Sequence, residues 1–206
     1  MTNAILTGDI VNSTELPVTE EKKLVQLFKR LSEPYIIEFF RGDSFQVYFK
    51  DASQSLKLAL LFRCAAKRVE IPGDAKFDVR TSIGLGAVER PVRLLATAKG
   101  EAFLLSGRAF DGMPDSGKRL VIVSASEVIN AGLDILSSYI DTLFKAMTAK
   151  QASTIFELIS GYTQAESAKR LKKSQATVNQ HAQGANWTEI KNLLDKFEQL
   201  IKLLPS

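Results

Sequence analysis

Apolar residues recur along this chain with two different periods. Between residues 20 and 31 they lie three or four residues apart, as at Leu24, Phe28 and Leu31, which predicts an amphipathic helix. Residues 52–69 form a second, more apolar helical segment. Short segments rich in β-branched and aromatic residues predict strands at 4–7, 35–40, 45–49, 77–88 and 120–123. The order β-α-β-β-α-β predicts an α+β protein with a ferredoxin-like domain over residues 1–125.

Beyond residue 125 the apolar pattern is helical throughout. Residues 126–147 are predicted to form a connecting helix, and residues 148–206 a C-terminal all-α domain. From Trp187 to Leu204, apolar residues repeat at spacings of 3, 4, 3, 4 and 3, a stripe of about two and a half heptads. Because this stripe is short for an independent coiled coil, we expect the helix to pack onto the small C-terminal domain. Pairing with a second copy of the chain is the alternative.

Within the C-terminal domain, residues 163–182 have the pattern of two short helices joined by a tight turn. Thr163 precedes Glu166 by three residues, a capping box that begins one helix, and Ser174 is placed to begin the next. This predicts helices at 163–171 and 174–182, with Val178 facing inward. Such a pair is the helix-turn-helix that places its second helix in a DNA major groove. A plain helical hairpin is the alternative interpretation.

Two positions depart from the usual helix-turn-helix pattern. Lys172 stands where the turn normally carries Gly, and His181 stands where an apolar residue is expected. The segment from Thr148 onward nevertheless resembles the C-terminal helix-turn-helix of sigma-factor-like bacterial regulators.

Charge gives modest support to DNA binding. Residues 148–206 hold eight Lys and Arg against five Asp and Glu, and four of the eight cluster beside the predicted turn. Gln and Asn side chains on the second helix can each bond an adenine edge. The residues predicted to contact DNA are Lys169, Arg170, Lys172, Lys173, Ser174, Gln175, Thr177, Asn179 and Gln180.

Composition excludes several classes of protein. The 206 residues carry a net charge of +4, and charged residues interrupt each apolar run before it reaches the length of a membrane span. The N-terminus lacks the features of a signal peptide, and one cysteine cannot build a disulfide framework, so we expect a cytoplasmic protein without membrane contact. Cys64 is expected in the core, and with His181 alone it cannot form a metal site.

Four segments of the first half resemble class III nucleotide cyclases. They are GDIVNST (8–14), RGDSFQVYF (41–49), VRTSIGLGAV (79–88) and KGEAFLLSGR (99–108), in the same order as in that family. A cyclase-like domain followed by this kind of helix-turn-helix resembles the SatD family of bacterial proteins over nearly the full chain.

The cyclase resemblance implies a nucleotide site. Asp9 and Asp43 would face each other across neighbouring strands and hold Mg²⁺ against the phosphates of a nucleotide. The amides of Ile10, Val11, Asn12 and Ser13 would cradle the phosphates, and Arg108 aligns with the transition-state arginine. In the alternative reading, Asp9 caps a turn and Asp43 belongs to an ordinary hairpin.

Two departures argue against efficient cyclase activity. The catalytic asparagine of the family falls on Leu104, and its base-selecting residue falls on Phe39, neither of which can form the required hydrogen bonds. We therefore expect a DNA-binding regulator. Its cyclase-like domain is expected to sense a nucleotide or another ligand, or to mediate the formation of a homodimer. The alternatives are a Mg²⁺-dependent nucleotide-binding enzyme with an accessory helix-turn-helix, and a protein that serves only protein contacts.

Overall fold

The computed structural model describes residues 2–40 and 42–204, so Arg41 of the predicted hairpin motif lies outside the described residues. In this part of the chain one mixed sheet has the strand order β2-β3-β1-β4-β5. Its strands are β1 (Asn3–Val11), β2 (Ile36–Phe40), β3 (Ser44–Phe49), β4 (Asp78–Gly86) and β5 (Leu120–Val123). The first four strands pair antiparallel in the ferredoxin-like order, and β5 adds to β4 in parallel.

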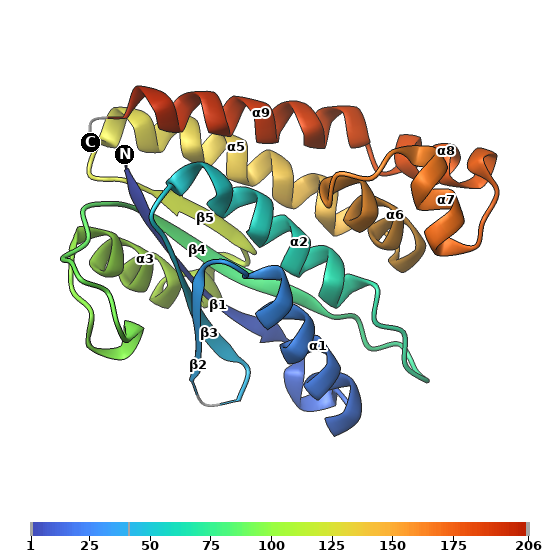
Figure 1. Cartoon of the computed structure of the whole chain (residues 1–206), viewed down its shortest axis with the longest axis horizontal. Helices are drawn as coiled ribbons and strands as arrows, with labels where there is room; N and C mark the ends of the chain where they lie inside the picture. Colours follow the sequence, from blue (N-terminus) through green and yellow to red (C-terminus); the bar gives the residue numbers. More distant parts are fainter. Residues whose placement is uncertain (1, 41, 205–206) are drawn as a thin grey trace.

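Helices make up most of the rest of the chain (Figure 1). The α-helices are α1 (Val18–Leu31), α2 (Ser55–Lys67), α3 (Glu101–Asp111), α4 (Met113–Ser116), α5 (Glu127–Ala146), α6 (Ala149–Ile159), α7 (Gln164–Leu171), α8 (Gln175–Gly184) and α9 (Trp187–Leu203). Short 3-10 helices lie at η1 (Ser13–Glu15), η2 (Ala52–Gln54) and η3 (Leu95–Thr97). No described helix is both long and apolar enough to cross a membrane.

The two faces of the sheet are covered by different helices. Leu6 and Ile10 of β1 belong to the large core beneath α1 and α2, while Ile5, which directly precedes Leu6, packs with Ala102 of α3 on the other face. Helix α3 approaches β4 so closely that a Cβ on Gly84 would lie 2.3 Å from the Ala102 carbonyl oxygen. A glycine is therefore required at this crossing.

Helix α3 was not predicted from the sequence, and β1 is longer than predicted. Ser106 and Gly107 interrupt the α3 segment with residues of low helix propensity, which obscures its apolar period. Strand β1 continues through Ile10 and Val11, which pair with Val79 and Asp78 of β4.

The expectation that the last helix packs chiefly on the small C-terminal domain was wrong. Helix α9 begins beside α8 and then runs along α5, contacting η2, α2 and α5 (Figure 1). Its buried residues Ile190, Phe197 and Ile201 join the same apolar core as the sheet. The physical reason is that α5 and α2 leave an apolar face uncovered, and the stripe of α9 buries it. One core therefore extends from the sheet through α6 to α9.

Candidate functional site

Asp9 lies on the sheet face covered by α3, where it is paired with an arginine. Arg80 is its direct cross-strand partner on β4, and donates from Nε to Oδ1 at 3.2 Å and from Nη2 to Oδ2 at 2.5 Å. The Arg80 guanidinium also lies 5.3 Å from the ring centre of Phe110 in α3. The charge of Asp9 is thus compensated within the chain.

Asp43 is brought together with another residue of the predicted nucleotide site. Ser13, at the start of η1, donates its hydroxyl at 2.5 Å to Oδ2 of Asp43, which lies in the turn between β2 and β3. Gly42 supports this turn with a φ of +85°, a conformation that favours glycine. Each of the two carboxylates thus has its own hydrogen-bond partner within the chain. The sharing of a cation by Asp9 and Asp43 stays a prediction. The described residues contain no group of three or more His, Cys, Asp or Glu arranged to hold a metal ion.

The predicted phosphate cradle has a mixed structure. Ile10 and Val11 are strand residues, whereas Asn12 turns the chain in the left-handed region with a φ of 61°. The Asn12 side chain donates to the Lys76 carbonyl oxygen at 2.9 Å and so ties this turn to the start of β4. The turn after β1 is therefore held in place from two sides, by Asn12 and by Ser13.

The three residues aligned with the cyclase catalytic and base-reading positions lie in different surroundings. Arg108 is exposed on α3 and forms no ion pair among the described residues, and Leu104, one turn earlier, is also exposed. The Phe39 ring packs at a tilt of 44° against that of Phe45, with 5.6 Å between ring centres, and Lys29 Nζ lies 5.7 Å from the centre of the Phe39 ring. Phe39 is thus a packing residue, and the loss of base selection stays a prediction.

A hollow of about 500 Å³ that sequence reasoning missed lies beside Asp9, between the sheet face and α3. Thr7 and Gln46 give the hollow polar side chains that are hydrogen-bonded to each other. The Gln46 amide donates to the Thr7 hydroxyl at 3.2 Å, and the Thr7 hydroxyl lies 2.9 Å from that of Ser106. Glu38 holds the η3 loop at its rim by accepting from the Leu95 amide at 2.9 Å. The remaining lining is largely aromatic, from Phe40, Phe45, Phe103 and Phe110. The alternation of β3 could have indicated Gln46, but not the covering loop.

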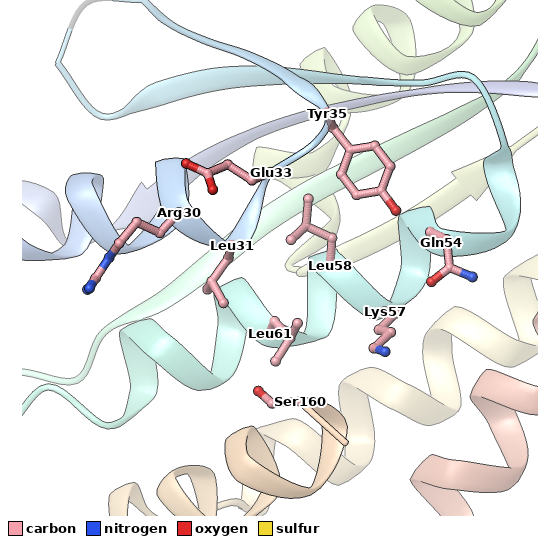
Figure 2. Close-up of a pocket in the computed structure, with 9 residues that line it drawn as sticks. All are labelled: Arg30, Leu31, Glu33, Tyr35, Gln54, Lys57, Leu58, Leu61 and Ser160. Carbon is pink, nitrogen blue, oxygen red and sulfur yellow. The ribbon is translucent and has the colours of Figure 1, made fainter. Parts of the chain in front are cut away.

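A second groove, of about 310 Å³, lies where α6 meets α1 and α2 (Figure 2). Tyr35, Lys57 and Ser160 line it from three different elements. Burial, with a smaller contribution from Asp51, raises the pKa of the Tyr35 hydroxyl, so this group stays protonated. None of the residues predicted from the sequence to form a site lines this groove.

In the C-terminal part, the predicted caps are present. The Thr163 hydroxyl accepts from the Glu166 amide at 3.3 Å, and the Glu166 carboxylate accepts from the Thr163 amide at 2.8 Å. The hydrogen bonds that the Thr163 amide and then the Thr163 hydroxyl donate to this carboxylate lower the pKa of Glu166. Ser174 caps α8 by accepting from the Thr177 amide at 3.1 Å. Lys172, in the turn between α7 and α8, adopts a left-handed φ of 53°, so it takes the conformation for which glycine is usually selected.

The two faces of α8 differ as the helical period predicts. Val178 and Ala182 are buried, while Gln175, Asn179 and Gln180 are exposed. Beside them, the exposed side chains of Lys169, Lys172 and Lys173 form no ion pair within residues 2–40 and 42–204. We call these three residues the lysine cluster.

Arg170 has a different environment from the lysine cluster. Its Nε donates to the Glu157 carboxylate of α6, and its guanidinium lies 4.0 Å from the ring centre of Tyr162. Glu157 is buried, so this ion pair fastens α7 to α6. The sequence offered no signal for the pairing, because the two residues lie on different helices.

The presence of His181 on the inner side of α8 is also explained by a contact with α6. Its Nδ1 lies 3.4 Å from the Thr154 hydroxyl, and the ring is half-buried where an apolar side chain was expected. Burial, then the nearby Lys173 and Lys150, lower the pKa of His181, which favours the neutral ring.

Comparison with known proteins yields similarity in structure alone. No family model matches the chain, and no curated protein sequence matches it. The dimeric guanylyl cyclase domain of the RhoGC fusion protein from the fungus Blastocladiella emersonii matches at 14% identity and a TM-score of 0.43, over 54% of this chain and 74% of that one. The active GGEEF domain of a diguanylate cyclase from Vibrio cholerae matches at 10% identity and a TM-score of 0.43, over 62% and 85%. A bacterial light-regulated adenylyl cyclase matches at 16% identity and a TM-score of 0.43, over 60% and 43%.

At these identities and TM-scores the similarities carry no information on activity. The α+β assignment rests on the sheet order of this chain itself.

Proposed function

We propose that this protein is a DNA-binding transcriptional regulator in which α7 and α8 form a helix-turn-helix. The observation that carries the proposal is the exposed polar face of α8 beside the unpaired lysine cluster. Helix α8 is held by Val178 and Ala182 on its inner face, which leaves its outer face free to enter a major groove.

The proposed contacts divide into two kinds. The lysine cluster contacts phosphates, which positions the protein without reading sequence. Gln175, Asn179 and Gln180 read base edges, since Gln and Asn can bond adenine through two hydrogen bonds. Ser174 and Thr177, at the start of α8, contribute further phosphate contacts. Arg170 was predicted to contact phosphate, but we now assign it to the Glu157 ion pair.

For the remainder of the chain we propose a cyclase-derived sensor. Residues 1–125 would form this domain, residues 126–147 the connection and residues 148–206 the DNA-binding domain, as in the SatD family that the sequence resembles. A nucleotide would bind near Asn12, Ser13 and Arg108. The compensation of Asp9 by Arg80 favours a sensor over an enzyme, because a carboxylate already paired with arginine is a poor Mg²⁺ ligand. We propose a homodimer because a palindromic operator requires one, although α9 buries its stripe within the chain.

Base reading can be tested by selecting a preferred duplex from a randomised pool. Gln175→Ala and Gln180→Ala should each weaken binding to that duplex by about 1–3 kcal/mol and leave binding to a scrambled duplex unchanged. Gln26→Ala, at an exposed position on α1, serves as the matched control. Equal binding of all three variants to the preferred duplex would show that α8 does not read DNA.

A further inference from the structure

A basic pocket lies at one end of the sheet, next to the predicted phosphate cradle, with which it shares Val11 and Asn12. It has a volume of about 320 Å³ and is bordered by α2, α5, the turn after β1 and the starts of β4 and β5. Its lining includes two carboxylates, those of Asp78 and Asp141. Five cationic side chains also line it: Arg63, Lys67, Lys76, Arg119 and Lys145.

The two carboxylates are occupied by internal partners. Arg63 donates from Nε and Nη2 to the two oxygens of Asp78, at 3.0 and 2.9 Å, and from Nη1 to Asp141 at 2.6 Å. The Val79 amide donates to Asp78 at 2.8 Å, and the Arg119 amide donates to Asp141 at 2.8 Å. Both carboxylates therefore have little capacity left for further cations.

The cations of the pocket outnumber its anions. Arg63 and Lys67 balance the negative charge of the two carboxylates. The Nζ of Lys67 lies 3.7 Å from Asp78. The side chains of Lys76, Arg119 and Lys145 form no ion pair among the residues that the structure describes. A concave site with three uncompensated cations concentrates positive potential, which attracts a multiply charged anion.

We propose that this pocket binds a small molecule that carries two or more phosphate groups. Its volume is near the lower end of small-molecule sites, roughly 300–1,000 Å³, and is too small for a nucleic-acid duplex. Arg119 offers the planar donor pair that fits phosphate oxygens, and Lys76 and Lys145 add point charges. The pocket adjoins the predicted nucleotide site through Val11 and Asn12, but Asp9, Asp43 and Arg108 do not line it.

The position of the pocket connects it to the DNA-binding part. Helix α2 continues to Arg68, whose guanidinium lies 3.9 Å from the ring centre of Phe156 in α6. Helix α5 leads into α6 through Met147 and Thr148. A phosphate bridging Lys145 of α5 and Arg119, which directly precedes β5, would stiffen the support on which α6 rests.

Pyrophosphate is the probe that tests this site. Titration of the full chain by calorimetry, at low and constant ionic strength, should show saturable binding of one pyrophosphate per chain. Arg119→Gln combined with Lys145→Gln should weaken this binding by about 10-fold or more for each cation removed. The control combines Lys196→Gln with Lys202→Gln, which changes the net charge equally on the exposed face of α9 and should leave binding intact.

Several outcomes would overturn the proposal. The first is that the parent shows no saturable binding of pyrophosphate. The second is that both double variants bind pyrophosphate equally weakly. The third is that the Arg119→Gln, Lys145→Gln variant loses affinity for duplex DNA while it keeps its affinity for pyrophosphate. Lys145→Glu provides a second test at an exposed position that the core does not need. Retention of pyrophosphate binding by Lys145→Glu would count equally against the site.

Discussion

The buried arginine of α2 allows a quantitative test of how the helices are held to the sheet. The Arg63 side chain is 1% exposed, and its partners Asp78 and Asp141 are 13% and 18% exposed. Because the carboxylates favour the charged form, the pKa of Arg63 is raised in spite of its burial. Replacing Arg63 by Met keeps an apolar stem of similar length but leaves two carboxylates without their main cation.

The cost of Arg63→Met follows from this geometry. Breaking a buried ion pair costs about 3–5 kcal/mol, because the remaining charge stays desolvated. Backbone amides still donate to both carboxylates, but only Asp78 keeps a cation, Lys67, so most of the loss falls on Asp141. We expect the free energy of unfolding to fall by about 3–5 kcal/mol, and Asp141→Asn in the same background to restore part of it.

Urea unfolding followed by circular dichroism measures this effect. The parent and both variants should unfold with similar m-values, so that the change lies in the transition midpoint. A loss below about 1 kcal/mol for Arg63→Met would place the network in the class of exposed ion pairs and refute the reasoning. A further fall on adding Asp141→Asn would equally contradict it.

Three further predictions concern the C-terminal part. Phe197→Ala should lower the free energy of unfolding by about 3–5 kcal/mol in urea melts, since Phe197 is fully buried in the shared core; a change below about 1 kcal/mol would show that α9 is detached. Lys172→Gly should raise the stability by up to about 1 kcal/mol in thermal melts by relieving the left-handed backbone, and a clear fall would argue against that conformation. The lowered pKa of His181 means that the folded state binds its proton less readily than the unfolded state, so stability should be full above about pH 6.5 and fall below it. His181→Gln should remove this part of the pH dependence in melts between pH 5 and 8, and an unchanged profile would assign it to another group.

Local interactions explain what could be predicted from the sequence. The capping box of Thr163 and the inward position of Val178 depend on spacings of a few residues, and both are found in the structure. The β-α-β-β-α-β order likewise follows from apolar periods and turns. These features could be predicted because interactions between residues close in sequence determine them.

Features that depend on pairing over long distances could not be predicted. Asp9 and Arg80 are 71 residues apart in sequence, and only the register of β1 against β4 places them opposite each other. The Glu157–Arg170 pair requires the packing of α7 on α6, which no local pattern specifies. The basic pocket is assembled from five separate segments, so no single motif indicated it.

The salt dependence of DNA binding tests the central claim most directly. Fluorescence anisotropy should compare the parent with the combination of Lys169→Gln, Lys172→Gly and Lys173→Gln, in which glycine suits the left-handed turn. Lys22→Gln with Lys196→Gln and Lys202→Gln is the control of equal charge. If each lysine of the cluster contacts one phosphate, the slope of log K against log salt should fall by about 0.9 per lysine, with weaker binding to every duplex. An unchanged slope, or a parent that binds no DNA at low salt, would contradict the account.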